Sequence, residues 1–145
     1  MQETQRTEIS TLGEFGLIDK LTENLKNRNA STRKAVGDDA AVLHYDGTTE
    51  LLVTTDMLME GIHFDLTYTP LKHLGYKAVA VNLSDICAMN GTPRQVTVSL
   101  ALSKRFSLED IEALYAGMRL CCERYGVDIV GGDTTSSLTG LAISI

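Results

Sequence analysis

The sequence has little of several residue types, and each shortage excludes a class of protein. Its 145 residues include no tryptophan, two prolines and three cysteines. The odd number of cysteines, without C-x-x-C spacing, argues against a disulfide framework, and we expect buried core thiols. No apolar run approaches membrane-spanning length, and the polar opening at residues 1–8 lacks the apolar core of a secretory signal. We therefore expect a cytoplasmic protein.

Basic charge and the common nucleotide-binding motifs are also missing. The formal net charge is -6, so no basic stripe is available to neutralise a nucleic acid backbone. The sequence contains neither G-x-x-x-x-G-K-[ST] nor a G-x-G-x-x-G that follows a strand. An acidic protein of this kind would need metal ions as intermediaries if it acted on phosphates.

The overall composition is that of an ordinary globular domain. Hydrophobic residues make up 43% of the chain and charged residues 22%, which excludes disordered and fibrous classes. With only Pro70 and Pro93, the chain has no proline-rich linker, and no internal repeat is visible. We predict a single domain over residues 1–145 with a substantial core.

Hydrophobic spacing predicts an α+β fold. Helical periodicity predicts helices over residues 13–27, 69–90 and 107–126, the third opened by a capping box at Ser107. Strands are expected at 40–45 and 51–55, which form a hairpin around Asp46-Gly47, and at 96–102, 127–130 and 141–145, whereas residues 27–34 are expected as a loop. This order favours a mixed or antiparallel sheet with two or three helices on one face. The open sheet face should then be covered by a second domain or a second subunit.

Acidic residues gather where these elements begin or end. The segments are Gly37–Ala40, Thr54–Asp56, Asn82–Asp85 and Gly131–Thr135. Antiparallel pairing of the hairpin would bring Asp39 and Asp56 to its open end, while Asn82 and Asp85 share a helix face. Converging carboxylates repel one another unless cations join them, and such hard oxygen ligands suit Mg2+. The pattern therefore predicts a metal site for phosphate chemistry.

Each of these features also has a simpler interpretation. Asp39 and Asp133 could belong to ordinary turns, and Asp56 could be a residue at the end of a strand. His63 alone is more typical of a surface or packed histidine, and Tyr115 of helix packing. The residues alone leave these alternatives open.

The order of the motifs resembles one enzyme family. The motifs are Gly13-Glu14-Phe15, Gly37-Asp38-Asp39-Ala40-Ala41-Val42, Thr55-Asp56, Glu60-Gly61-Ile62-His63-Phe64, Leu74-Gly75-Tyr76-Lys77-Ala78, Asn82-Leu83-Ser84-Asp85 and Gly131-Gly132-Asp133-Thr134-Thr135. This series resembles the thiamine-monophosphate kinases. Its G-D-D-A and N-x-S-D elements are shared by the wider AIR synthase-like superfamily, which includes selenophosphate synthetase and hydrogenase maturation relatives.

The resemblance implies an ATP-dependent kinase of thiamine biosynthesis that phosphorylates thiamine monophosphate to thiamine diphosphate. It implies several Mg2+ ions and direct transfer without a catalytic nucleophile from the protein. It also implies a homodimer formed through amino-terminal domains, of which this chain would be one, without the family's carboxy-terminal domain. By motif position, the expected contacts are metal ligands Asp39, Thr54, Thr55, Asp56, Asp85 and Asp133, ATP contacts Tyr115, Gly132 and Asp133, and a substrate contact His63. The alternatives are another ATP-dependent superfamily member with a different acceptor, or a non-catalytic module for dimerisation or metal binding.

Overall fold

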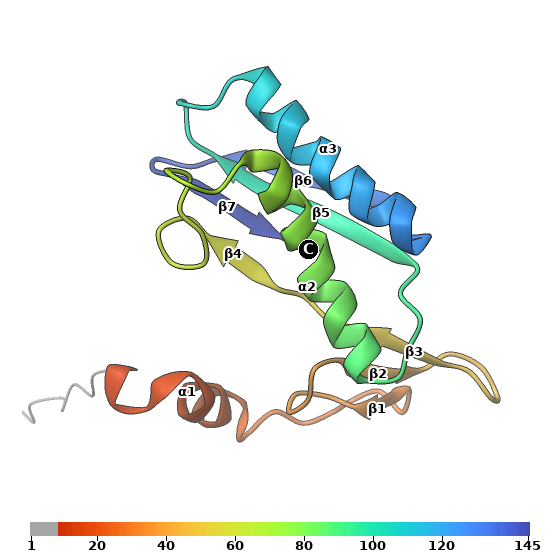
Figure 1. Ribbon diagram of the computed structural model, residues 1–145. Helices are drawn as coiled ribbons and strands as arrows, with labels where there is room; N and C mark the ends of the chain where they lie inside the picture. Colours follow the sequence, from red (N-terminus) through yellow and green to blue (C-terminus); the bar gives the residue numbers. More distant parts are fainter. Residues whose placement is uncertain (1–8) are drawn as a thin grey trace, which may run out of the picture.

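A computed structural model describes residues 9–145, and the polar segment 1–8 lies outside the described residues. Figure 1 shows the elements. In chain order they are η1 (Ile9–Thr11), α1 (Gly13–Thr22), β1 (Thr32–Lys34), β2 (Ala41–His44), β3 (Glu50–Val53), β4 (Met57–Met59), α2 (Leu71–Ala88), β5 (Gln95–Leu102), α3 (Leu108–Tyr125), β6 (Asp128–Ser136) and β7 (Leu141–Ser144).

The strands form two sheets. The smaller sheet has the order β1-β2-β3 and is antiparallel, and the larger has the order β4-β7-β5-β6. In the larger sheet only β5 and β6 run parallel. Helices α2 and α3 lie together over one face of the larger sheet (Figure 1). The predicted α+β class with a mixed sheet and helices on one face is confirmed, but the expected single sheet is wrong.

The core lies between the two helices and the four-stranded sheet. Alternate residues of β5 are buried at Val96, Val98 and Leu100, as the period of a half-buried strand predicts. They pack against α2 and α3 side chains that include Leu74 and Met118. This layer is the main source of hydrophobic stabilisation, because its side chains are almost fully removed from water.

The cysteines only partly match the expectation of core thiols. Cys121 and Cys122 are buried in α3, and burial raises the pKa of both thiols. Cys87 is exposed, so its predicted burial is wrong. It lies in the last turn of α2, past the buried residues of that helix, which end at Leu83.

Both ends of α3 follow their local sequence, whereas the start of α2 differs from it. The Asp110 amide donates to the Ser107 hydroxyl oxygen, and Asp110 Oδ2 accepts from the Ser107 amide, which completes the predicted capping box. Gly126 ends α3 in the left-handed conformation at φ 66°. Thr69, however, is not the cap of α2, because Pro70 occupies that position and the Thr69 amide belongs to the preceding turn through a bond to Asp65 O.

Several strands differ from the sequence expectation. β1 lies in a segment expected as a loop, because its Thr-Arg-Lys sequence is polar, as suits an exposed edge strand. β4 was not predicted, because a run of three apolar residues is too short to show the hydrophobic period of a strand or a helix. β6 extends six residues beyond the predicted end at Val130, since β5 pairs with it as far as Ser136. The register of a neighbouring strand therefore overrides the turn signal of Gly131-Gly132.

Helix α1 does not join the sheet face. It ends at Thr22 rather than near Asn27, and none of its residues is buried. Phe15 and Leu21 are exposed, and Figure 1 shows the helix extending away from the body of the molecule. The expectation of up to three helices on the sheet thus reduces to α2 and α3.

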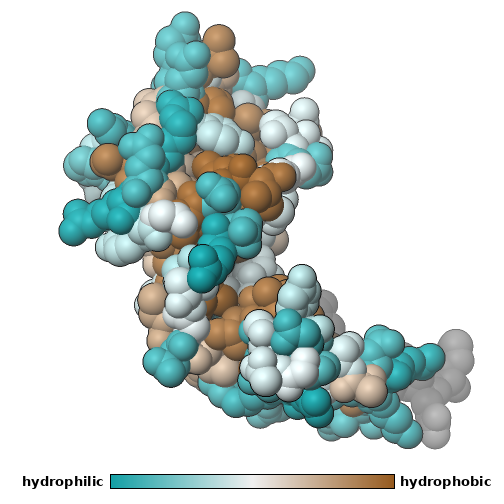
Figure 2. Space-filling model, turned by 90° about the vertical axis from the view of Figure 1, so that its right-hand side faces the viewer, coloured by the Kyte–Doolittle hydropathy of each residue, from teal (hydrophilic) through white to brown (hydrophobic). Residues whose placement is uncertain are grey.

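The surface is divided by a narrow waist. Figure 2 shows two lobes, with apolar residues reaching the surface on both sides of the waist.

Within residues 9–145, no helix has both the length and the apolar character needed to cross a membrane.

Helices α2 and α3 cross at very short range. A Cβ atom added to Gly75 would lie 1.9 Å from the Leu114 main-chain oxygen, and one added to Gly117 would lie 1.8 Å from the Lys72 oxygen. Both positions therefore exclude any side chain. The contact fixes where α2 lies along the sheet.

We predict that Gly117→Ala lowers the free energy of unfolding by about 1–3 kcal/mol, because the added methyl group forces the helices apart. The measurement is urea unfolding followed by circular dichroism. Gly16→Ala is the matched control, since its added Cβ would meet only Leu12 Cβ at 3.6 Å on the exposed α1. That variant should not be destabilised, and equal stability of Gly117→Ala and the parent would contradict the close crossing.

Candidate functional site

The candidate site lies where the chain leaves β3 and crosses to the four-stranded sheet. The Thr54 hydroxyl donates to the Asp39 main-chain oxygen at 2.9 Å and is also 3.2 Å from Asp85 Oδ2. The β2–β3 pairing, which matches Ala41 with Val53, places residue 39 beside residue 54 at the open end of the hairpin. Three segments far apart in the sequence, from two strands and α2, therefore meet at the Thr54 side chain.

A buried amide secures the next turn of α2 to the same segment. Asn82 is 5% exposed, and its Oδ1 accepts from the Asp56 amide at 3.1 Å while its Nδ2 donates to the Ala78 oxygen at 3.0 Å. Both ends of the side chain are thus satisfied inside the protein. Because Asp85 lies three residues further along the helix, the same bond sets the distance between the two acidic side chains.

Asp56 and Asp85 carry like charges in a partly buried setting. Burial raises the pKa of the Asp56 carboxyl, Asp85 raises it further, and His63 acts in the opposite direction. None of the ion pairs among residues 9–145 involves either acid. Ionised carboxylates so placed attract a cation, because a positive charge would remove both the repulsion and much of the desolvation cost.

The donor chemistry fits Mg2+, although the acids are not tightly clustered. In the described part of the chain, no group of three or more histidine, cysteine, aspartate or glutamate side chains lies close enough to hold a metal ion. The oxygens at this point are instead a hydroxyl, a main-chain oxygen and two carboxylates. Mg2+ commonly takes only one or two protein carboxylates and keeps several waters, so this set suits it.

Two expected metal ligands, Thr55 and Asp133, belong to the opposite side of the sheet. The Thr55 hydroxyl lies 3.2 Å from Ser144 Oγ, and Ser144 pairs with Ser99, which in turn pairs with Asp133. Ser99 is exposed between two buried neighbours, so this row faces away from the helices. Asp133 lies two strands from Ser144, which is about 10 Å at ordinary strand spacing. The expected ligands thus form two groups.

The residues expected to contact ATP do not line a common cavity. Tyr115 packs partly against the core and lines a cavity of about 580 Å³ beside the end of α3 and the start of β6. Gly132 and Asp133 are not among the lining residues. Packing alone requires glycine at position 132, because an added Cβ atom would lie 1.8 Å from the Val98 oxygen.

His63 projects from the loop that follows β4. Its side chain is exposed, and its Nδ1 accepts from the Met59 amide at 2.9 Å. The charge of His63 lowers the pKa of Asp56, so these two residues interact electrostatically.

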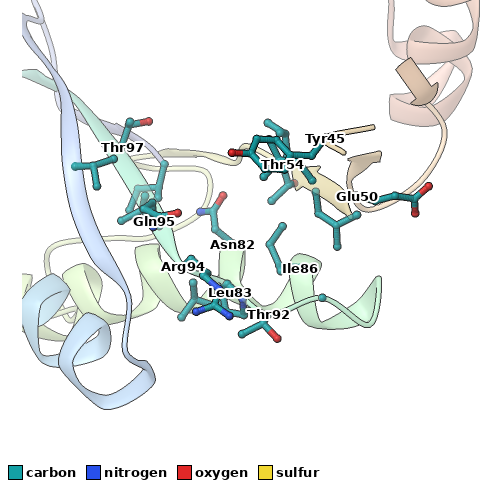
Figure 3. A pocket seen from close by; sticks show the side chains of 18 of the residues that line it. Tyr45, Glu50, Thr54, Asn82, Leu83, Ile86, Thr92, Arg94, Gln95 and Thr97 are labelled. Carbon is teal, nitrogen blue, oxygen red and sulfur yellow. The ribbon is translucent and has the colours of Figure 1, made fainter. Parts of the chain in front are cut away.

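A larger cavity of about 720 Å³ opens beside Thr54 and Asn82. Figure 3 shows Thr54 on the hairpin side, Asn82 and Ile86 rising from α2, and Thr97 on β5. This volume lies within the range of pockets that accept small molecules. The space between the small sheet and the main body is therefore large enough for a ligand next to Thr54.

Sequence reasoning missed the residues that hold the His63 loop. Glu60 forms an ion pair with Arg105, and Lys77 Nζ donates to the His63 main-chain oxygen at 2.9 Å. Glu60 was visible as part of the Glu60–Phe64 motif. Its partner, which lies 45 residues further along the chain, could be found only from the fold.

Comparison with known proteins gives a family and close relatives. The model of the family "AIR synthase related protein, N-terminal domain" matches residues 37–145. The thiamine-monophosphate kinase of Bacillus subtilis (strain 168) is 37% identical over 134 residues, which cover 92% of this chain and 41% of the relative. That of Aquifex aeolicus (strain VF5) is 39% identical over 129 residues, covering 89% and 40%. The chain thus spans about 40% of the length of these relatives.

Solved structures share the fold. The structure described as AaThiL complexed with AMPPCP and TMP has a TM-score of 0.85 at 35% identity, over 97% of this chain and 43% of that one. The tt0281 protein of Thermus thermophilus has a TM-score of 0.80 at 25% identity, over 94% and 43%. A HypE–HypF complex, with a TM-score of 0.63 at 20% identity over 88% and 39%, is alike in fold alone.

We predict that Asp56→Asn stabilises the metal-free fold at neutral pH. The folded protein holds the Asp56 pKa above its ordinary value of 3.8, so folding disfavours the ionised carboxylate. This penalty is absent at pH values below the ordinary pKa and develops as the pH rises through the raised pKa. The free energy of unfolding of the variant should exceed that of the parent at neutral pH and converge with it in acid.

Asp65→Asn provides a control of opposite sign. The Thr67 amide donates to Asp65 Oδ1 at 2.8 Å and lowers the Asp65 pKa, so removal of this charge should reduce stability at neutral pH. That difference should fade as the pH falls through the lowered pKa. Urea unfolding at several pH values measures both variants, and a shift of the same sign in both would contradict the electrostatic argument.

Proposed function

The chain belongs to the family "AIR synthase related protein, N-terminal domain", and we propose that it is the metal- and ATP-binding part of a thiamine-monophosphate kinase. The observation that carries this proposal is the meeting of Asp39, Thr54, Asp56 and Asp85 at one point between the two sheets. The thiamine-monophosphate kinases that cover most of this chain support the choice of reaction. The proposed product is thiamine diphosphate, with ATP as phosphoryl donor.

Asp56 and Asp85 are proposed to hold Mg2+ together with oxygens of Asp39 and Thr54. Bound Mg2+ would neutralise the charge on the transferring phosphoryl group and its neighbours. The chain's contribution is to fix the donors before a ligand arrives. The Thr54 hydroxyl orients Asp85, and Asn82 fixes the main chain of Asp56. Thr55 and Asp133 are proposed as ligands of further Mg2+ ions on the other side of the sheet.

ATP is proposed to contact Tyr115, Gly132 and Asp133. Tyr115 can offer an aromatic face and a hydroxyl beside the 580 Å³ cavity, while the main chain of Gly132 could contact a phosphate next to the open space at Gly131, where an added Cβ would meet nothing within 4 Å. The structure described as AaThiL complexed with AMPPCP and TMP supports an ATP-like ligand for a protein of this fold. Magnesium held at Asp133 would then adjoin the nucleotide phosphates.

His63 is proposed to contact thiamine monophosphate. Because the charge of His63 acts on Asp56, a phosphate held at His63 would be within electrostatic reach of the acidic pair. Phosphoryl transfer depends mainly on positioning and on neutralisation of charge, so no covalent phosphoenzyme is required. We therefore propose direct transfer between two bound phosphates, with no catalytic nucleophile supplied by the chain.

A homodimer through the open face of the four-stranded sheet is also proposed. Helices α2 and α3 cover only one face (Figure 1), and Met57, Met59 and Val130 are exposed large apolar side chains of this sheet. The facing positions Ser99, Ala101 and Ala142 are small, so a second sheet could approach closely over β5 and β7, while Asp133 on the edge strand β6 would stay outside the interface. An apolar area of this kind commonly marks a protein interface.

We predict that Asp85→Asn weakens Mg2+-dependent binding of a non-hydrolysable ATP analogue at least about tenfold, since loss of even an outer partner of a metal ligand commonly costs 10- to 100-fold in affinity. Isothermal titration with and without Mg2+ measures the effect. Asp46→Asn is the matched control, because Asp46 only caps the far turn of the hairpin through the amides of Thr48 and Thr49. Unchanged binding by Asp85→Asn with retained circular dichroism would refute the assignment.

The same experiment separates the alternatives. Binding of the analogue that does not depend on Mg2+, or no binding at all, would favour a non-catalytic module. Phosphorus NMR with ATP, Mg2+ and thiamine monophosphate tests the acceptor. Consumption of ATP without formation of thiamine diphosphate would favour another acceptor within the superfamily.

We predict that Ala101→Arg converts the dimer to a monomer, because a charge in the centre of a buried sheet face lacks a partner. Light scattering should give twice the chain mass for the parent and the chain mass for the variant. Leu120→Arg places the same charge on the exposed side of α3 and should leave the dimer intact. A monomeric parent would exclude the proposed interface.

A further inference from the structure

The loop between β4 and α2 is held by main-chain hydrogen bonds and by the side chain of Glu60. The Gly61 amide donates to Phe64 O at 2.8 Å, and the Ile62 and His63 amides both donate to Met59 O. Phe64 is 6% exposed and anchors the far end in the core. Gly61 has φ 80°, a conformation that glycine adopts without strain. At the near end, the Glu60 side chain adds a further contact to these main-chain bonds.

Glu60 continues the pairing of β4 with β7 by two routes. Its amide donates to Leu141 O at 3.0 Å, and its Oε2 accepts from the Leu141 amide at 2.9 Å. The carboxylate therefore does what a main-chain oxygen does elsewhere in the ladder. Gly140, at φ 72°, leaves room for it, since an added Cβ would lie 3.2 Å from Glu60 Oε2.

Arg105 holds the other oxygen of this carboxylate. Its guanidinium forms the ion pair with Glu60 Oε1 and lies over the Phe106 ring, 4.7 Å from the centroid. Arg105 belongs to the turn between β5 and α3, so the pair joins two loops that are distant in sequence. The Glu60 side chain is only 18% exposed, which distinguishes this contact from a fully solvated surface ion pair.

The geometry of this loop determines which nitrogen of His63 is free. Nδ1 accepts from the Met59 amide, so in the neutral ring the proton is on Nε2. Lys77 fixes the main chain of the same residue through its carbonyl oxygen. Nε2–H is then an exposed donor, which suits an anionic oxygen such as that of a phosphate ester.

We propose that Glu60 and Arg105 are positioning residues that act through His63. Together they hold the Glu60–Phe64 loop in the arrangement that presents His63 Nε2–H as a donor to the phosphate of the acceptor substrate. The identity of that acceptor rests on the proposed function, whereas the arrangement of the loop does not. If the pair is broken, Glu60 keeps only its contacts with Leu141, the Met59–His63 contact loosens and both ring tautomers become populated.

Nitrogen-15 NMR of the histidine rings tests this directly, because protonated and unprotonated ring nitrogens resonate far apart. The parent at neutral to mildly basic pH should show a single Nε2–H tautomer for His63, assigned by its absence in His63→Ala. Arg105→Ala should shift both ring nitrogens of His63 toward the average of the two tautomers. Arg105→Lys, which keeps a positive donor for Glu60, should largely restore the parent spectrum.

Two further variants separate positioning from general stability. Glu60→Gln keeps an oxygen for the Leu141 amide but loses the ion pair, so it should shift His63 as Arg105→Ala does. The double variant should add nothing further, because both changes break the same contact. Arg124→Ala is the matched control, since Arg124 also lies over an aromatic neighbour, Tyr125, at 5.8 Å, but at the far end of α3. It should leave the His63 signals unchanged.

The ligand titration adds a functional readout. Thiamine monophosphate should shift the His63 signals of the parent. Arg105→Ala should raise the Kd for thiamine monophosphate about fivefold, because the Glu60–Phe64 loop would then have to be ordered on binding. A His63 spectrum unchanged in Arg105→Ala and Glu60→Gln would overturn the proposal. If the parent spectrum did not respond to thiamine monophosphate, the proposed acceptor would fail, while the tautomer measurements would still decide the role of the pair.

Discussion

The hydrogen bond from the Asp56 amide to Asn82 is the contact on which the arrangement of the site depends. The chain leaves the small sheet after β3 and enters the four-stranded sheet at β4, and Asp56 lies at this transfer. Its main chain is held on one side by Ile145, at the end of β7, and on the other by the buried Asn82 amide. The two sheets and α2 therefore share one fixed point. The Thr54 hydroxyl then links the hairpin directly to Asp85.

The position of α2 is itself set from the opposite side. Gly75 and Gly117 allow α2 and α3 to cross so closely that neither helix can slide along the other without a main-chain clash. The turns that carry Asn82 and Asp85 follow from Gly75 at fixed helical intervals. Packing in the core thus sets the separation of two like charges outside it. Burial and then Asp85 raise the pKa of Asp56, so the fold holds this acid where its ionised form is disfavoured, as is common at functional sites.

The sequence was sufficient for features that depend on local signals. The capping box at Ser107, the end of α3 at Gly126 and the alternation of β5 follow from residues within a few positions of one another. Features that depend on pairing were not predictable. The length of β6 is set by β5, which offers a free edge beside Gly131-Gly132. The acids around Thr54 were found because hairpin topology brings strand ends together. The separate position of Asp133 required the register of β5 with β6, and the Arg105 contact required the full fold.

The division of the acids between two sides of the sheet has a physical consequence. Successive side chains of an extended segment point in opposite directions, so Thr54 and Asp56 serve one side while Thr55 serves the other. If all the carboxylates shared one small volume, their mutual repulsion would be severe whenever cations were absent. Asp133 lies two strands away, and Asp85 is the acid that adds to the effect of burial on the pKa of Asp56. The fold can therefore form before cations and phosphates bind, and these ligands would supply the charges that connect the two groups. Such a site is assembled by its ligands, and this suits a reaction between two phosphate-bearing molecules.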